Sequence, residues 1–122
     1  MLEGAAPACV GSDPRPEQLP TALLPGSSVP VRIRAYCAEI LPVLAETVPA
    51  IKPNIAFFEA HGPEGFAAYA EICRMARDAG LLVVGDIKRG DIGSTAEAYA
   101  SYHAEITDAV TLHPYLGRDA LA

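Results

Sequence analysis

The chain has 122 residues, 51% of them hydrophobic, and a formal net charge of −6 at pH 7. This length and hydrophobic content fit a single globular domain over residues 1–122 and exclude a disordered chain. The acidic balance, without any dense run of Lys and Arg, argues against nucleic-acid or anionic-membrane binding, because both rely on a clustered positive field.

The N-terminal part of the chain predicts a strand, a long connection and a helix. Residues 8–11 form a short apolar run that stops at the turn signal Ser12-Asp13-Pro14. A Pro-rich connection over residues 13–30 follows. Pro30 suits the first turn of the next helix, and Pro42 should kink it. The apolar face of this helix has the spacing of three and four residues that is typical of a helix: Ile33, Tyr36, Cys37, Ile40, Leu41, Leu44 and Val48.

The middle of the chain predicts a second strand and a second helix. Residues 48–58 are mostly apolar and extended. We expect the strand to end near Lys52, because Pro53 disfavours helical geometry at the residue before it. Residues 61–63 open the next helix, and Gly80 fits its C-terminal cap. Its expected inward face comprises Phe66, Tyr69, Ala70, Cys73 and Ala76.

The remaining residues repeat the same alternation. Residues 81–85 are a continuous apolar run, typical of a strand covered on both faces, and residues 94–97 (STAE) have the spacing of a capping box. The helical face that follows is Tyr99, Tyr102, His103 and Ile106, and residues 108–112 form a fourth strand. Alternating strands and helices imply right-handed βαβ units and a parallel sheet. The expected fold class is α/β, a partial TIM (β/α)8 barrel of about the first four βα units, since a whole barrel needs ~250 residues.

The cysteines and the N-terminus indicate the compartment. Cys9, Cys37 and Cys73 lie far apart among apolar neighbours, without metal-ligand spacing, so we expect buried, reduced thiols. The start MLEGAAPACVG lacks a basic segment followed by a long apolar stretch, and no run approaches the ~18 apolar residues of a membrane span. We therefore expect a cytoplasmic protein.

Charged residues follow the third strand in VVGDIKRGDIGST, residues 83–95. Because residues i and i+2 of a strand point the same way, Asp86 and Lys88 should share a face at its C-terminal end. In a barrel this face is the interior, beside the usual active site. Lys52 lies at the C-terminal end of the second strand, and Asp13 follows the first strand. Both should therefore lie at the same rim of the barrel, which the C-terminal ends of its strands form. Asp91 brings the number of carboxylates to three. Surface ion pairs worth ~0–1 kcal/mol each are the plainer explanation, but the convergence on two lysines argues against it.

These residues resemble orotidine 5′-phosphate decarboxylase, in its bacterial second subfamily, along nearly the whole chain. The matching segments are CVGSDPRPEQLP, AIKPNIAFFEAHGPEGF, LLVVGDIKRGDIGSTAEAYA and DAVTLHPYLG. The motif D-x-K-x-x-D also occurs in related sugar-phosphate enzymes, but together with KPNIAFFEAHG and DIGSTAEAYA it is highly specific. The resemblance implies conversion of orotidine monophosphate to UMP and CO₂ in pyrimidine biosynthesis, with no metal or organic cofactor.

The resemblance also implies a role for each charged residue. Lys88 would donate a proton to C6 of the pyrimidine, Asp86 would lie against the departing carboxylate, and Lys52 would complete a row of alternating charges. Asp91 would join the row in a partner subunit, so that a homodimer shares its active sites. The implied substrate-binding residues are Asp13, which would hold a ribose hydroxyl, Lys52, Ile92, which would line an apolar pocket, and Thr95, which would reach the neighbour's ribose.

Several other polar residues carry weaker signals. Ser12 stands where the resembled family usually has an apolar residue, and His113 stands where Asn is common. We expect Arg89 to face solvent or a partner chain. Helix-surface or interface positions are expected for His61 and His103.

The sequence lacks the later strands of the resembled family, which carry the pyrimidine-amide contacts and the phosphate grip. We therefore expect the N-terminal half of a decarboxylase barrel, with little activity alone, because remote phosphate binding normally helps to lower the barrier. Two alternatives stay open. A related D-x-K-x-x-D sugar-phosphate aldolase or decarboxylase would be favoured by a requirement for Mg²⁺. A non-catalytic half-barrel remnant would lack the phosphate-binding segment in its downstream reading frame.

Overall fold

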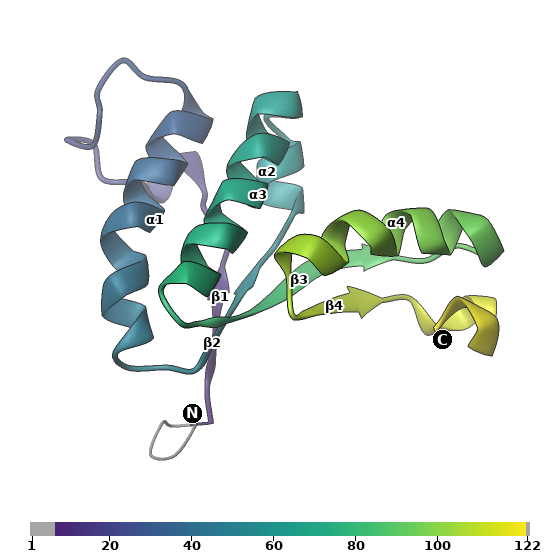
Figure 1. Cartoon of the computed structure of the whole chain (residues 1–122). Coiled ribbons are helices and arrows are strands. Elements are labelled where there is room, and N and C mark those ends of the chain that lie inside the picture. Colours follow the sequence, from purple (N-terminus) through teal and green to yellow (C-terminus); the bar gives the residue numbers. More distant parts are fainter. Residues whose placement is uncertain (1–6, 122) are drawn as a thin grey trace.

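The computed structural model describes residues 7–121, in which four strands alternate with helices (Figure 1). The strands are β1 (Cys9–Ser12), β2 (Ala50–Pro53), β3 (Leu82–Arg89) and β4 (Ala109–Leu112). The helices are α1 (Val29–Ala45), α2 (Ala56–Glu59), α3 (Gly62–Asp78) and α4 (Gly93–Ile106), and short 3₁₀ turns cover Pro16–Gln18, Pro114–Leu116 and Arg118–Ala120. Within residues 7–121, no helix has the length and apolar character needed to cross a membrane. The alternation confirms the predicted α/β class.

The four strands form one parallel sheet in the order β1-β2-β3-β4. Each strand lies beside the next along the chain, and right-handed crossovers place the connecting helices on one face. Figure 1 shows α1 and α3 side by side over β1 and β2, with α4 over β3 and β4. Because the strands run in one direction, their C-terminal ends meet at one edge of the sheet, which is where the charged residues follow.

The hydrophobic core lies between the sheet and its helices. It is built from the predicted faces of α1 and α3 and from alternate positions of β2 and β3: Ile33, Cys37, Leu41, Tyr69, Ala70, Cys73, Ala76, Ile51, Val83 and Ile87. Burial raises the pKa of the two core thiols, Cys37 and Cys73, to about 12, which keeps them protonated. Cys9 is exposed, so its predicted burial is wrong. It begins the edge strand β1, which has a neighbouring strand on one side only.

Two helix ends follow the local sequence signals. Pro30 lies in the first turn of α1, where its missing N–H costs nothing. After α3, Gly80 adopts a φ of +89°, and its N–H donates to the Arg77 carbonyl at 2.9 Å. The Leu81 N–H donates to the Ala76 carbonyl at 3.0 Å. These two bonds are the Schellman motif, which uses glycine because the left-handed conformation is strained for other residues.

The apolar sequence of residues 48–58 predicts an extended segment, but the structure is extended only to the end of β2. It turns at Asn54, whose Oδ1 accepts the Ala56 N–H at 3.2 Å, and residues 56–59 form α2. The turn buries Phe58 completely, with its ring edge-on to Tyr69 at 5.5 Å between centroids. The asparagine side chain and this tertiary contact outweigh the extended tendency of the apolar run.

The predicted capping box before α4 is also wrong. The helix begins at Gly93, with Ile92 at the N-cap position and no side-chain hydrogen bond to the cap. Ser94 therefore lies inside the first turn. The helix thus begins two residues earlier than the STAE spacing predicts, and Gly93 enters it with a φ of +48°, a conformation that glycine adopts without strain.

His103 lies in the core instead of at the predicted helix surface. Its side chain is 4% exposed and meets the rings of Phe66, Tyr69 and Tyr102 at 5.9–6.5 Å between centroids. Burial lowers the pKa of this imidazole, and the nearby positive charge of Arg89 lowers it further. The helical spacing of the α4 face correctly included His103, but its polar character misled the prediction of exposure.

The two faces of β3 differ in exposure. Val83 is fully buried under the helices, whereas Leu82 on the opposite face is 44% exposed. Leu112 of β4 is also 44% exposed. The prediction that the third strand is covered on both faces is therefore wrong for this chain. Among the described residues, β1 and β4 each have one neighbouring strand only.

We expect the isolated 122-residue chain to self-associate or to lack cooperative unfolding. Two open strand edges template association, and each Å² of apolar surface left in water forgoes ~25 cal/mol. Sedimentation velocity and near-UV circular dichroism test this expectation. A sharp monomer that unfolds cooperatively would contradict it.

Candidate active site

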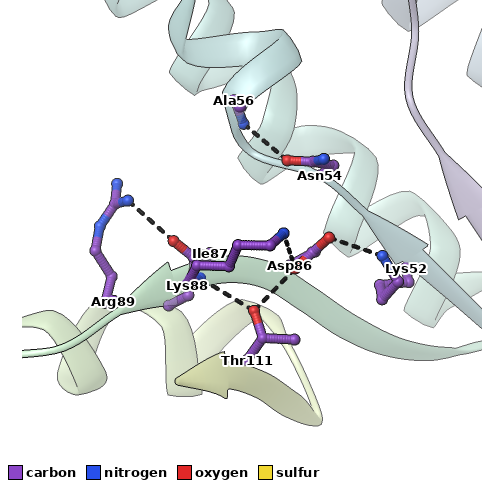
Figure 2. A network of polar contacts seen from close by, with 8 residues as sticks. All are labelled: Lys52, Asn54, Ala56, Asp86, Ile87, Lys88, Arg89 and Thr111. Carbon is purple, nitrogen blue, oxygen red and sulfur yellow. Dashed lines mark hydrogen bonds and ion pairs between the residues drawn. The ribbon is translucent and has the colours of Figure 1, made fainter. Parts of the chain in front are cut away.

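Three charged side chains meet at the C-terminal edge of the sheet (Figure 2). Lys52 lies on β2, and Asp86 and Lys88 lie on β3. The Lys52 Nζ donates to Asp86 Oδ2 at 2.7 Å, and the Lys88 Nζ donates to Asp86 Oδ1 at 2.5 Å. One carboxylate thus holds two ammonium groups, one on each oxygen. The structure brings these three predicted residues together, and we call them the charge row.

A fourth residue, Thr111 of β4, completes this network, and sequence reasoning missed it. Its Oγ1 donates to Asp86 Oδ1 at 2.9 Å and accepts the backbone N–H of Lys88 at 3.0 Å. The available signal was a hydroxyl among the apolar residues of a strand that pairs with the charged segment. One threonine side chain ties β4 to both members of the charge row on β3.

Lys88 has an unusual backbone conformation for a strand residue. Its φ is +48°, in the left-handed region that non-glycine residues rarely adopt. The pairing of β3 with β4 is irregular at this point, because the register advances four positions along β3, from Gly85 to Arg89, but only two along β4, from Val110 to Leu112. Asp86 and Lys88 therefore meet across a bulge and not across a regular i, i+2 face. The predicted contact is present, but the reason given for it was wrong.

Glycines allow close packing at both ends of this bulge. A Cβ on Gly85 would lie 2.7 Å from the Tyr69 hydroxyl and 3.1 Å from the Thr107 Cγ2. A Cβ on Gly90 would lie 2.7 Å from the Cβ of His113. The two 2.7 Å distances are shorter than real Cβ contacts, so a larger residue at either position would force the neighbouring side chain or the strand to move.

The surroundings of Asp86 hold it ionised. Burial alone would raise its pKa, because the side chain is only 6% exposed. The hydrogen bonds from Lys52, Lys88 and Thr111 outweigh burial and lower the pKa of Asp86 to about 2. The hydrogen bond to Asp86 in turn raises the pKa of Lys52 against the opposing effect of burial.

Asp13 lies on the Lys52 side of the charge row. It is exposed after β1, and its charge contributes to the raised pKa of Lys52. Asp13 also lines a cavity of about 450 Å³ between β1 and α1, together with Arg15 and Tyr36. Its predicted position at the rim is therefore the one observed.

The other three predicted site residues lie away from the charge row. In the described part of the chain, the Asp91 carboxylate contacts neither lysine and accepts the Ile92 N–H at 2.8 Å. Asp91 lines a second cavity, of about 560 Å³, between α4 and the ends of β3 and β4. Ile92 is 60% exposed, and Thr95 is exposed on the first turn of α4.

The arrangement fixes a positive charge at a defined point on the rim. The Lys88 side chain is 58% exposed while Asp86 is 6% exposed, so the ammonium can meet a ligand with the carboxylate behind it. A cation held in this way can stabilise or protonate negative charge that develops on a ligand. Among residues 7–121, no three His, Cys, Asp or Glu side chains are grouped so as to hold a metal ion.

Residues 9–122 match the sequence model of the orotidine 5′-phosphate decarboxylase / HUMPS family. The chain belongs to this family. It is 48% identical over 115 residues to an orotidine 5′-phosphate decarboxylase of Roseiflexus sp. strain RS-1, a match that covers 93% of this chain and 40% of the relative. It is also 43% identical over 136 residues to the orotidine 5′-phosphate decarboxylase of Rhodopirellula baltica, a match that covers 99% of this chain and 45% of the relative.

Solved structures of the family confirm the fold class. A Streptomyces avermitilis structure described as a candidate orotidine 5′-phosphate decarboxylase superimposes with a TM-score of 0.82 at 38% identity, over 98% of this chain and 43% of that one. The structure of the Leishmania donovani OMP decarboxylase superimposes with a TM-score of 0.74 at 38% identity, over 93% of this chain and 41% of that one. The chain therefore spans less than half the length of these relatives and forms a partial TIM barrel.

Acid should destabilise the protein through Asp86. The folded pKa of about 2 is below the ~3.9 of an unfolded Asp, so this stabilisation is complete above about pH 4 and is lost as the pH falls towards 2. The difference amounts to ~2.5 kcal/mol in the free energy of unfolding. It can be measured by urea unfolding between about pH 2 and 6. The protein for this test is the chain fused to the remaining length of the Roseiflexus relative, here called the completed barrel.

Two variants isolate the contribution of the carboxylate. Asp86→Asn should flatten this part of the pH profile relative to the wild type, because an amide cannot ionise. Thr111→Val removes one hydrogen bond that lowers the pKa of Asp86, so the acid-dependent loss of stability should be smaller than in the wild type and should end at a higher pH. An Asp86→Asn profile as steep as that of the wild type would show that other carboxylates cause the loss.

Proposed function

We propose that residues 1–122 are the N-terminal half of a cytoplasmic orotidine 5′-phosphate decarboxylase, which converts orotidine monophosphate to UMP and CO₂. The observation that carries this proposal is the charge row, in which the ammonium of Lys88 is held 2.5 Å from a buried, ionised carboxylate. Family membership over residues 9–122 supports it.

Decarboxylation places negative charge on C6 of the pyrimidine, and the Lys88 ammonium can stabilise that charge. When the bond from C6 to the carboxylate breaks, its electron pair stays on C6 and CO₂ leaves. The Lys88 ammonium faces this developing carbanion and then transfers its proton to C6, which leaves UMP and a neutral lysine that solvent reprotonates. Because the negative charge on C6 is larger in the transition state than in the ground state, the cation stabilises the transition state selectively.

Asp86 has two effects in this scheme. Its carboxylate forms an ion pair with the Lys88 ammonium and holds it at the rim before the substrate enters. It also lies where it would face the substrate carboxylate, and repulsion between two carboxylates is relieved when the substrate loses neutral CO₂. Lys52 holds the second oxygen of Asp86, which limits rotation of the carboxylate away from Lys88.

The remaining site residues are proposed to bind substrate and to complete a shared site. Asp13 would bind a ribose hydroxyl beside Lys52. Ile92 and Thr95 are exposed on the segment that also carries Asp91, so all three are free to reach the site of a second subunit. The assembly proposed is a homodimer in which each subunit donates Asp91 to its partner's charge row.

A sugar-phosphate aldolase or a different decarboxylase with the same D-x-K-x-x-D motif is the weaker alternative, because the curated relatives are orotidine 5′-phosphate decarboxylases. The completed barrel tests the proposal directly. It should convert orotidine monophosphate to UMP, and the conversion can be monitored by ultraviolet absorbance. Neither this chain alone nor the Roseiflexus segment alone should catalyse the reaction. A completed barrel that folds and turns over only a sugar phosphate, or nothing, would refute it.

Replacing Lys88 should abolish most catalysis and spare binding. In the completed barrel, Lys88→Ala should lower kcat by ~10³-fold or more, because it removes the charge and the proton aimed at C6. Binding of UMP, measured by isothermal titration calorimetry, should remain within about threefold, because the product carries no charge at C6. Arg74→Ala, an exposed arginine of α3, is the matched control and should change neither value. Retention of more than about a tenth of wild-type turnover would reject Lys88 as the proton donor.

Mixed dimers should reveal the shared site. Asp91→Ala and Lys88→Ala inactivate different halves of each composite site, so a hybrid dimer regains one site with both residues intact. Mixing the two inactive completed barrels should therefore restore part of the wild-type activity, up to about a quarter if subunits assort at random. If labelled subunits exchange and activity never returns, Asp91 acts within its own chain.

A further inference from the structure

Arg89, the residue that follows Lys88, joins three elements of the fold. Its Nη1 donates to the Ile87 carbonyl at 3.0 Å, and its Nη2 forms an ion pair with Glu59 at the end of α2. The guanidinium also lies over the Tyr99 ring of α4, 5.6 Å from the centroid. The side chain is 26% exposed. These contacts replace the predicted exposure to solvent or to a partner chain.

These contacts surround the strained backbone of Lys88. The carbonyl before Lys88 accepts from the Arg89 guanidinium, and the Lys88 N–H donates to Thr111 Oγ1 at 3.0 Å. The Arg89 carbonyl accepts the His113 N–H at 2.9 Å. One backbone group of each of three consecutive residues is thus held, and the middle residue, Lys88, has the φ of +48°. Figure 2 shows Arg89 at the opposite end of this network from Lys52, pointing away from the charge row.

We propose that Arg89 is a positioning residue that holds Lys88 in its left-handed conformation, so that its ammonium is aimed from the rim beside Asp86. A non-glycine residue persists in this conformation only where its surroundings impose it. The inference rests on the proposed function for its catalytic consequence, but its structural part stands on the contacts alone.

The shape of the arginine side chain explains why this residue type fits. The planar guanidinium directs separate N–H groups at the Ile87 carbonyl and at Glu59 while one face lies on Tyr99. A lysine has one ammonium on a flexible stem, so it can satisfy Glu59 or the carbonyl but not both with the same geometry. An exposed ion pair alone would contribute little, so the proposal depends on the three contacts acting together.

The test compares four variants of the completed barrel: Arg89→Gln, Arg89→Lys, Glu59→Gln and, as control, Arg74→Gln. Two measurements are made on each variant that folds. Hydrogen exchange by NMR reports whether the Lys88 N–H keeps its bond to Thr111 Oγ1. Steady-state kinetics separates kcat from KM for orotidine monophosphate.

Arg89→Gln should accelerate exchange of the Lys88 amide and lower kcat by about 10- to 100-fold, with KM within about twofold, because a small misplacement of a reacting group is costly. Arg89→Lys and Glu59→Gln should give smaller effects in the same direction, and Arg74→Gln should give none. If Arg89→Gln fails to fold, the two milder variants decide. A purely structural role would lower the melting temperature while native kcat and Lys88 exchange stay as in the wild type, and this result would overturn the proposal.

Two other outcomes are informative. A rise in KM without a change in Lys88 exchange would mean that Arg89 contacts the substrate, and this also overturns the positioning role. If the wild-type completed barrel has no decarboxylase activity, the proposed function fails. The exchange data alone then decide whether Arg89 holds Lys88 in place.

Discussion

The structure of the rim depends on one buried carboxylate. Burying an ionised Asp is unfavourable unless donors surround it, and Asp86 receives hydrogen bonds from Lys52 on β2, Lys88 on β3 and Thr111 on β4. Three neighbouring strands are therefore held at their C-terminal ends by the same group that sets the local charge. A change that loosens one strand there also changes the electrostatics of the site, so fold and chemistry are coupled through Asp86.

The irregular end of β3 is the second constraint. A regular strand would continue its hydrogen bonds into β4, but the bulge turns Lys88 into a left-handed conformation and leaves its N–H to Thr111. Gly85 admits the Tyr69 hydroxyl against the strand just before the bulge. The strain at Lys88 is thus balanced by tight packing on one side and by hydrogen bonds on the other, as is typical of sites where a reactive group must be fixed.

Local signals in the sequence predicted the elements, and non-local contacts set what the sequence could not show. Helical spacing identified the buried face of α3, and Gly80 marked its end, because both depend on residues a few positions apart. The burial of His103 and the network of Thr111 depend on which elements pack together. The charge row was predictable because parallel strands bring their C-terminal ends to one edge, but the bulge that aims Lys88 has no short-range signature.

The geometry of the charge row is complete within the described chain, while the enclosure around it is not. Every donor to Asp86 comes from β2, β3 or β4, so no further segment is needed to ionise the carboxylate or to keep the two ammonium groups against it. By contrast, Leu82, on the face of β3 opposite the helices, is 44% exposed, and Lys88 itself is largely open to water. Water around a charge weakens its interaction with a ligand, because the local dielectric constant is high. The relatives are more than twice as long. The arrangement of the three charged side chains needs none of that additional length, because β2, β3 and β4 already hold it.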